Sequence, residues 1–173
     1  MTTVILTGFM GTGKTSIGQR LAARLGVPFV DTDALVEQNA GRSVAAIFAD
    51  DGETAFRAAE RRAVQAALDV PHAVVATGGG AIADPVNLVA LRAAAPIVCL
   101  TARPEVILRR ALASGPTRPL LQGDDPAARI AALLAARAPA YAQADHTVDT
   151  SDAPLEQLVA AIADLLPRRE PCA

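Results

Sequence analysis

The sequence predicts a three-layer α/β/α protein with a five-stranded parallel sheet. Five short apolar runs alternate with longer segments whose apolar residues recur at helical spacing. Strands that are joined through helices pair in parallel, and a parallel sheet is buried on both faces, which explains why the runs are almost wholly apolar. Ligands of such sheets bind at the carboxyl ends of the strands. Residues at those ends are therefore the first candidates for function.

The predicted elements follow one another in a regular order. The first run is apolar and β-branched, and the first helical segment carries Ile17, Leu21 and Leu25 at helical spacing. Gly41 separates the two helical segments that follow the second strand. We expect strands at residues 2–7, 27–31, 73–77, 97–101 and 146–149, and helices at about 14–25, 32–40, 44–69, 85–94, 103–113, 127–142 and 155–166.

The composition is that of one domain spanning residues 1–173. Of the 173 residues 51% are hydrophobic, and a chain of this length buries about 70% of the surface that its unfolded form exposes. The formal charge of −2 gives no basic surface for nucleic acid or an anionic membrane. We expect a monomer whose tail, from about residue 167 to residue 173, is disordered.

The cysteines and the apolar runs predict a cytoplasmic protein. Cys99 lies in an apolar run and Cys172 in the tail, so no disulfide is expected and a reducing compartment fits. No signal peptide opens the sequence, and no apolar run reaches the 18 residues of a membrane-spanning helix.

A glycine-rich loop follows the first strand and opens the first helix. From Gly8 to Thr15 it fits the pattern GxxxxGK[ST] of the phosphate-binding loop, or P-loop. Backbone N–H groups of such a loop cradle phosphates, while Lys14 would reach the outer phosphates and the Thr15 hydroxyl would bind Mg²⁺. Lys14 is the only lysine of the chain. The Asn-Lys-x-Asp signature of guanine specificity is therefore excluded, and an adenine nucleotide is favoured.

Two carboxylates, Asp31 and Asp33, stand at the end of the second strand. In an extended segment this spacing puts both on one side, with Thr32 facing away. One can bind a hydrated Mg²⁺, and the other can accept a hydrogen bond or the proton of an attacking hydroxyl. Many ATPases and GTPases bind Mg²⁺ with an aspartate at the end of the third strand, and this strand lacks one. If any carboxylate binds the metal here, it is therefore Asp31. The alternative is a helix cap, and both jobs can coexist.

Three successive glycines, Gly78 to Gly80, follow the third strand. They indicate either a positive φ or a close approach of the backbone to a neighbour. Either would suit a ligand whose hydroxyl groups bond to main-chain N–H groups. A flexible turn is the simpler alternative.

Three arginines are candidates for binding an anion. Arg57 and Glu60 are three residues apart on one helix face, a spacing that also fits a surface ion pair. Arg137 stands two residues before a proline that is expected to distort its helix. Arg118 lies in a Gly/Pro-bounded segment, about 113–126, which resembles a mobile lid. An arginine brought in by lid closure can stabilise phosphoryl transfer.

Together these motifs resemble those of the shikimate kinases. The likeness rests on segments that stand in the family's order, at residues 8–18, 29–33, 47–48, 51–53, 56–57 with 60, 78–81, 118–121 and 137–139 with 141. It implies a nucleoside-monophosphate-kinase-like P-loop kinase fold. It also implies transfer of the γ-phosphoryl group of ATP to the 3-hydroxyl of shikimate, a step in chorismate and aromatic amino acid biosynthesis.

The resemblance assigns roles by position. Catalytic roles fall to Lys14, Asp33 and Arg118. Shikimate would be bound by Asp33, Arg57, the Gly79 backbone and Arg137. The nucleotide would be bound by Gly11, Thr12, Gly13, Lys14, Thr15, Ser16, Arg110 along the adenine, and Arg118. One Mg²⁺ would be held by Thr15 and, through water, by Asp31.

Residues 113–116 and 152–154 depart from the family's pattern, and the second segment lacks a basic residue that some relatives place near the adenine. No nucleotide contact is therefore assigned after Asp149. A kinase for another polyol acid, such as gluconate, is the nearest alternative, and a non-catalytic nucleotide-binding module is the alternative of another class. The paired arginines and the glycine segment argue against the first. The presence together of a phosphate-binding lysine, a metal-binding hydroxyl, two carboxylates and a lid arginine argues against the second. These are Lys14, Thr15, Asp31, Asp33 and Arg118.

Overall fold

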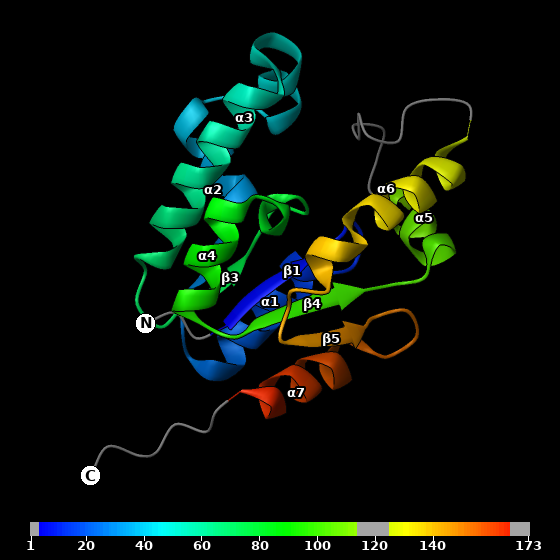
Figure 1. Ribbon diagram of the computed structural model, residues 1–173. Helices are drawn as coiled ribbons and strands as arrows, with labels where there is room; N and C mark the ends of the chain where they lie inside the picture. The colour runs from blue at the N-terminus through cyan, green and yellow to red at the C-terminus, as the bar shows by residue number, and fades with distance from the viewer. Residues whose placement is uncertain (1–3, 114–124, 167–173) are drawn as a thin grey trace.

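The computed structural model describes residues 4–113 and 125–166 (Figure 1). Five strands form one sheet in the order β2-β3-β1-β4-β5, and all neighbouring strands are parallel. The strands are β1 (Val4–Gly8), β2 (Phe29–Asp31), β3 (Val74–Ala76), β4 (Ile97–Thr101) and β5 (His146–Asp149). The predicted α/β class with a five-stranded parallel sheet is therefore confirmed.

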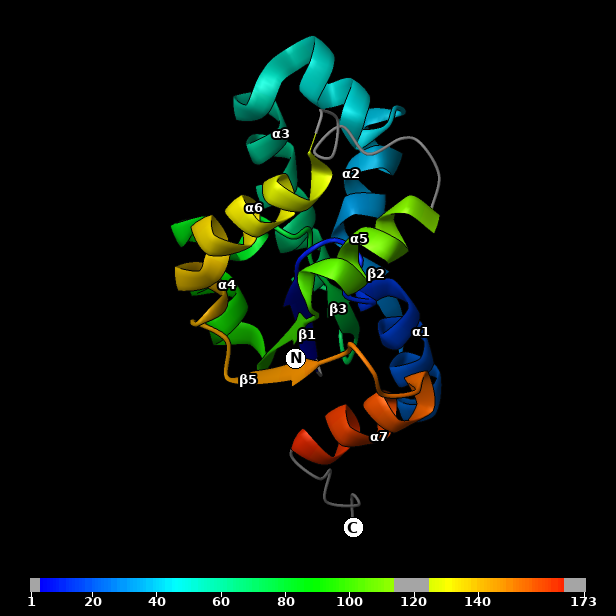
Figure 2. The same cartoon turned by 90° about the vertical axis from the view of Figure 1, so that its right-hand side faces the viewer.

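Helices cover both faces of the sheet, as Figures 1 and 2 show. Successive residues of β1 point to opposite faces: Leu6 packs with the helices α1 and α7, and Ile5 packs with α3 and α4. The helices are α1 (Lys14–Leu25), α2 (Thr32–Ala40), α3 (Val44–Leu68), α4 (Pro85–Ala94), α5 (Pro104–Ala113), α6 (Pro126–Tyr141) and α7 (Leu155–Leu165), with a 3₁₀ turn, η1 (Ala81–Ala83).

Most element boundaries agree with the predicted ones, and those of α1, α2, α4, β4 and β5 coincide. β2 begins two residues later than expected. The Val27 N–H donates to the Ala22 carbonyl at the end of α1, and Pro28 has no N–H to offer a neighbouring strand. Val27 therefore finishes the helix, and the chain joins the sheet at the Pro28 carbonyl, which accepts the Val74 N–H at 2.9 Å.

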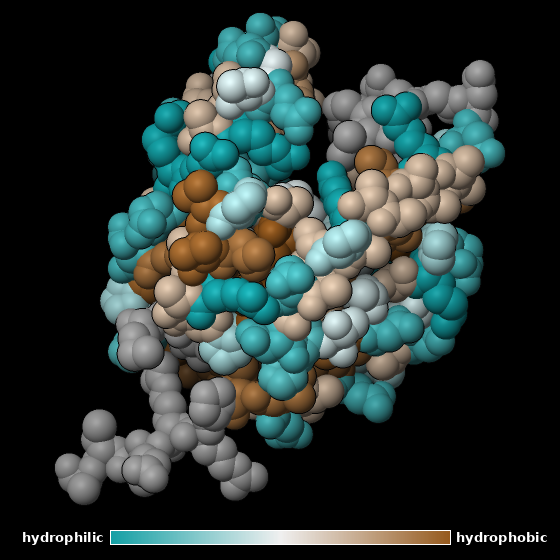
Figure 3. Space-filling view, viewed as in Figure 1, coloured by the Kyte–Doolittle hydropathy of each residue, from teal (hydrophilic) through white to brown (hydrophobic). Residues whose placement is uncertain are grey.

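The longest predicted helix is broken at Gly52. α3 has non-helical torsions there, with φ of 81° and ψ of 177°, a region that is open essentially to glycine alone. With α2, the first part of α3 forms an arm at one end of the sheet, and Figure 3 shows the surface hollowed between this arm and α6. The sequence pattern predicted one helical region and missed the kink.

Some predicted features lie outside the described residues. These are residues 2 and 3 of the expected first strand, most of the expected lid, Arg118 and the tail. Within residues 4–113 and 125–166, no helix is long and apolar enough to cross a membrane.

Candidate active site

The P-loop connects the middle strand of the sheet to α1. At Gly8 the chain passes so close to β4 that a Cβ there would lie 2.2 Å from the Leu100 carbonyl oxygen. The loop ends at Gly13, the N-cap of α1. N–H groups in the first turn of a helix have no partner inside the helix and favour an anion. The loop brings this helix end to the carboxyl edge of the sheet.

Lys14 begins α1 and folds back over the loop. Its Nζ donates to the carbonyl oxygens of Gly8, at 2.9 Å, and Phe9, at 3.0 Å. The buried Thr12 hydroxyl donates to the same Phe9 oxygen at 2.8 Å. These bonds hold the ammonium group against the backbone of the loop.

A pocket of about 640 Å³ opens beside the loop. Residues from the carboxyl ends of the strands, from the loop and from α5 line it. The lining includes these residues singled out from the sequence: Gly11, Thr12, Gly13, Lys14, Thr15, Ser16, Asp31, Asp33 and Arg110. The predicted nucleotide and metal residues among the described part of the chain are therefore in one place.

The two carboxylate oxygens of Asp31 accept hydrogen bonds from different parts of the chain. Oδ1 accepts the N–H groups of Asp33, at 3.0 Å, and Ala34, at 3.4 Å, so that Asp31 caps α2. Oδ2 accepts a hydrogen bond from the Thr15 hydroxyl at 3.1 Å. Asp31 therefore caps α2 and also lies beside the P-loop, and the sequence pattern was compatible with both roles. A hydroxyl and a single carboxylate suit Mg²⁺, which takes few protein ligands and keeps waters and phosphates.

The expected geometry of Asp33 is wrong. β2 ends at Asp31, so Thr32 and Asp33 belong to the first turn of α2 rather than to an extended segment. Asp31 turns the chain into the helix by capping it. The Thr32 side chain is buried and accepts the Gly78 N–H at 3.0 Å, while Asp33 still lines the pocket. Burial, helped by the charge of Asp31, raises the pKa of Asp33 to about 6.

The glycine segment is surrounded by charged side chains. A Cβ at Gly78 would lie 2.6 Å from Asp33 Oδ1 and 2.9 Å from Glu60 Oε1. Because neither distance leaves room for a side chain, Gly78 lets both carboxylates approach the backbone. No residue of this segment is among the glycines with a positive φ, so of the two reasons offered by the sequence, close approach is the one that applies.

The next two glycines meet the two arginines. A Cβ at Gly79 would lie 3.2 Å from Arg137 Nη1, and a Cβ at Gly80 would lie 2.8 Å from Arg57 Nη1. Arg57 comes from α3 and Arg137 from α6. The fold therefore gathers Asp33, Arg57 and Arg137 around three consecutive glycines.

Arg57 pairs with two glutamates of α3, one exposed and one buried. Arg57 donates from Nη2 to Oε1 of the exposed Glu53 at 3.2 Å. Its Nη1 donates to Glu60 Oε2 at 2.7 Å, and the Glu60 side chain is 1% exposed. Burial raises the pKa of Glu60, while the bond from Arg57 acts in the opposite direction. The sequence spacing identified the pair and could not show its burial, which results from the packing of α3 against the glycine segment.

Arg137 lies on a helix that continues past its proline. α6 includes Pro139 and ends at Tyr141, so the proline does not stop it. The Arg137 guanidinium lies over the Phe9 ring, 5.3 Å from its centroid. Tyr141, one turn after Arg137, donates its hydroxyl to the Gly79 carbonyl at 2.7 Å. Burial raises the pKa of Tyr141, which keeps this hydroxyl a donor at neutral pH.

The carboxyl end of β5 also belongs to the pocket. Thr150, Ala153 and Leu155 line it, although no contact was assigned after Asp149. Arg110 reaches this segment and donates from Nη2 to the Thr150 carbonyl at 2.6 Å. The missed signal was topological, because all parallel strands, β5 included, end at the same edge of the sheet.

Comparison with known proteins points to one family. A family model described as shikimate kinase matches residues 10–167. A curated protein named shikimate kinase, from Caldanaerobacter subterraneus subsp. tengcongensis, is 49% identical over 158 residues, which are 91% of this chain and 92% of that protein. A solved shikimate kinase from Acinetobacter baumannii in complex with shikimate has a TM-score of 0.88 and 34% identity, with 94% of this chain and 90% of that chain covered.

A more distant match bears on the gluconate alternative. A solved gluconokinase from Sinorhizobium meliloti 1021 has a TM-score of 0.52 and 20% identity, with 94% of this chain and 92% of that chain covered. A likeness at this level shows a shared fold alone.

Proposed function

The chain belongs to the shikimate kinase family, and from that premise we propose that it transfers the γ-phosphoryl group of ATP to the 3-hydroxyl of shikimate. The products are shikimate 3-phosphate and ADP. The observation that carries the assignment is the convergence of Arg57, Arg137 and Asp33 on the glycine segment beside the P-loop pocket. Planar guanidinium groups match the carboxylate of an acceptor in two places, and a nearby carboxylate can accept the hydrogen bond of its hydroxyl.

The nucleotide side comprises the P-loop from Gly8 to Thr15 with Ser16, Asp31, Arg110 and Thr150. The α1 N-terminus and Lys14 bind the phosphates, and Arg110 lies along the adenine. Thr15 and, through water, Asp31 would hold one Mg²⁺, which would supply positive charge beside the outer phosphates. The bond between Thr15 and Asp31 supports the choice of these two residues, since it brings a hydroxyl and a carboxylate oxygen within 3.1 Å.

The acceptor side comprises Asp33, Arg57, Gly78 to Gly80 and Arg137. Arg57 and Arg137 bind the shikimate carboxylate, and the Gly79 N–H bonds a ring hydroxyl. Glu60 holds the Arg57 guanidinium in place, and Tyr141 fixes the orientation of the Gly79 peptide through its carbonyl. Paired guanidinium groups offer the forked geometry that a carboxylate matches best.

Asp33 stands where the two sides meet. It accepts a hydrogen bond from the attacking 3-hydroxyl and orients it toward the γ-phosphate. With a pKa of about 6, Asp33 is ionised at neutral pH and is basic enough to take the proton as the new bond forms. Lys14 and Arg118, the lid arginine that lies outside the described residues, stabilise the transferring group. Catalysis then comes from positioning and electrostatic stabilisation.

One assay tests the function against its alternatives. ADP release is measured with MgATP and shikimate, gluconate or no acceptor. We expect release with shikimate well above the other two rates. Equal rates with and without shikimate would overturn the assignment, faster release with gluconate would establish the polyol-acid alternative, and no release with any acceptor would favour a non-catalytic module.

Two sequence-based expectations about the whole molecule stay predictions. We propose that the protein acts as a monomer and that it works in the cytoplasm. Light scattering after gel filtration, with and without both substrates, tests the first expectation.

A further inference from the structure

Thr150 directly follows β5 and belongs to the nucleotide side of the site. Its side chain is 1% exposed and lines the pocket. The backbone N–H donates to the Thr101 carbonyl at the end of β4, at 2.8 Å. This hydrogen bond holds the backbone of Thr150 at the end of β4.

The Thr150 hydroxyl connects three separate elements. It lies 2.9 Å from the Thr12 carbonyl oxygen of the P-loop and 3.0 Å from the Thr101 carbonyl oxygen of β4, both of which accept its hydrogen. It also accepts a hydrogen bond from Arg110 Nη1 of α5 at 3.1 Å. A threonine hydroxyl has one hydrogen and two lone pairs, so two carbonyls share the donor while Arg110 occupies an acceptor position.

Thr150 accepts hydrogen bonds from both terminal nitrogens of the Arg110 guanidinium. Nη1 donates to the Thr150 hydroxyl and to the Gly11 carbonyl, each at 3.1 Å. Nη2 donates to the Thr150 carbonyl at 2.6 Å. Because the guanidinium is planar and its N–H groups lie in that plane, bonds from both nitrogens define the orientation of the plane.

We infer that Thr150 is a positioning residue that orients Arg110 in the nucleotide site. This inference rests on the proposed role of Arg110 beside the adenine. Thr150 holds the guanidinium at one angle before the nucleotide arrives, so binding does not have to order a long arginine side chain. Its own anchoring to Thr12 and Thr101 ties that angle to the P-loop and the sheet.

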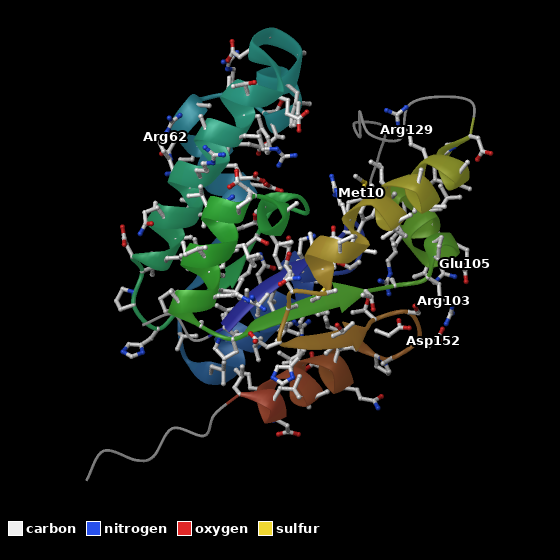
Figure 4. The ribbon with its side chains drawn as sticks, in the orientation of Figure 1. Met10, Arg62, Arg103, Glu105, Arg129 and Asp152 are labelled. Atoms are coloured by element: carbon white, nitrogen blue, oxygen red, sulfur yellow. The ribbon has the colours of Figure 1, made fainter. Side chains whose placement is uncertain are left out.

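The segment that follows Thr150 supplies an internal control. On its outer side, Asp152 accepts two hydrogen bonds from Arg103, at 2.6 and 2.7 Å, and Glu105 pairs with the same arginine (Figure 4). Asp152 is exposed and does not line the pocket. An Asp152→Asn substitution weakens the ion pair between Asp152 and Arg103 and leaves the hydrogen bonds of Arg110 unchanged.

The test compares Thr150→Val, Thr150→Ser and Asp152→Asn in the full chain. Binding of the non-hydrolysable ATP analogue AMPPNP with Mg²⁺ is measured by calorimetry. Thr150→Val keeps the shape but removes the hydroxyl, so the Thr12 carbonyl and Arg110 Nη1 each lose a hydrogen bond. We expect roughly tenfold weaker binding. Thr150→Ser and Asp152→Asn should stay within about twofold of the wild type. The KM for shikimate should be unchanged in all three variants.

A double-substitution cycle separates orientation of Arg110 from general loosening. In an Arg110→Ala background, Thr150→Val should weaken binding by less than about twofold, since the residue that it positions is gone. A full additional loss in that background would overturn the inference. So would wild-type binding by folded Thr150→Val, or an equal loss in Asp152→Asn.

Two further controls keep the outcome clear. If Thr150→Val does not fold, as judged by circular dichroism, Thr150→Ala replaces it in the same cycle, because alanine removes the hydroxyl without placing a methyl group against the carbonyls. AMPPNP binding needs no acceptor. A wild-type chain that binds AMPPNP but does not phosphorylate shikimate would therefore contradict the proposed function while leaving the role of Thr150 measurable.

Discussion

The two sides of the site require glycine for different reasons. On the nucleotide side, Gly8 and Gly13 have φ of 134° and 93°, so the backbone itself demands glycine. On the acceptor side, Gly78 to Gly80 have no positive φ, and charged side chains of α2, α3 and α6 approach where a Cβ would stand. The first requirement is local and visible in a short motif. The second is created by elements far apart in the sequence, and substitutions should separate the two.

The largest effect is expected for Gly8→Ala. The new Cβ would lie 2.2 Å from a backbone oxygen of the adjacent central strand, at a φ that residues with side chains rarely adopt. To relieve this overlap the strand or the loop would have to move, and either movement is energetically costly. We therefore expect the free energy of unfolding to fall by about 3–5 kcal/mol. Urea unfolding measures this. A variant within 1 kcal/mol of the wild type would show that the backbone constraint is much weaker than the geometry indicates.

Asp33→Asn should have the next largest effect, and on turnover rather than on folding. Asparagine can still contact a hydroxyl but cannot take its proton, so kcat should fall on the order of 10²- to 10³-fold. The KM values for both substrates should change little. Steady-state kinetics with each substrate varied in turn tests this, and a normal kcat would remove Asp33 from the chemistry.

The raised pKa of Asp33 gives the same substitution a second signature. Activity of the wild type should decline as the pH falls through about 6, where Asp33 becomes protonated. In an acid whose folded-state pKa is raised, the folded protein binds the extra proton between pH 3.8 and about 6, so stability falls as the pH rises through that window. Asp33→Asn should therefore be more stable than the wild type at pH 8, by up to about 3 kcal/mol. Equal or lower stability there would contradict a buried, ionised carboxylate.

Arg137→Ala should affect the acceptor side selectively. Loss of a forked contact to the substrate carboxylate should raise the KM for shikimate roughly 100-fold, with the KM for ATP within about threefold. Arg137→Lys should restore only part of the affinity, because an ammonium group does not match a carboxylate in two places. Arg62, exposed on α3 and labelled in Figure 4, provides the control: Arg62→Ala should leave both KM values unchanged. A parallel rise in the KM for ATP would show that the contact of Arg137 with Phe9 of the P-loop matters more than the acceptor.

The same contrast explains how much the sequence could reveal. The P-loop, Asp31 and the strand ends were predictable, because each is encoded within a few consecutive residues whose spacing has a local physical cause. The helical geometry of Asp33 was missed because a capping Asp31 ends the strand two residues before it. The burial of Glu60 and the polar contacts of Thr150 depend on which elements pack together and on the strand order β2-β3-β1-β4-β5. No local pattern carries that information.

The smallest expected effect belongs to Gly80→Ala. Gly80 has an ordinary φ of −107°, so alanine fits the backbone, and its Cβ would meet the end of the Arg57 side chain at 2.8 Å. A guanidinium can shift where a strand carbonyl cannot, and stability should change by less than about 1 kcal/mol. Displacement of Arg57 should raise the KM for shikimate about tenfold and leave the KM for ATP unchanged.

A background substitution decides whether Arg57 is the reason for glycine at position 80. An Arg57→Ala chain lacks the side chain that the new methyl group would displace. In that background, Gly80→Ala should therefore not raise the KM for shikimate any further. If the two losses instead add in full, the glycine is required by the acceptor or by the backbone rather than by Arg57. The acceptor side would then resemble the P-loop, with a requirement that originates in the local chain, and the difference between the two sides would disappear at this position.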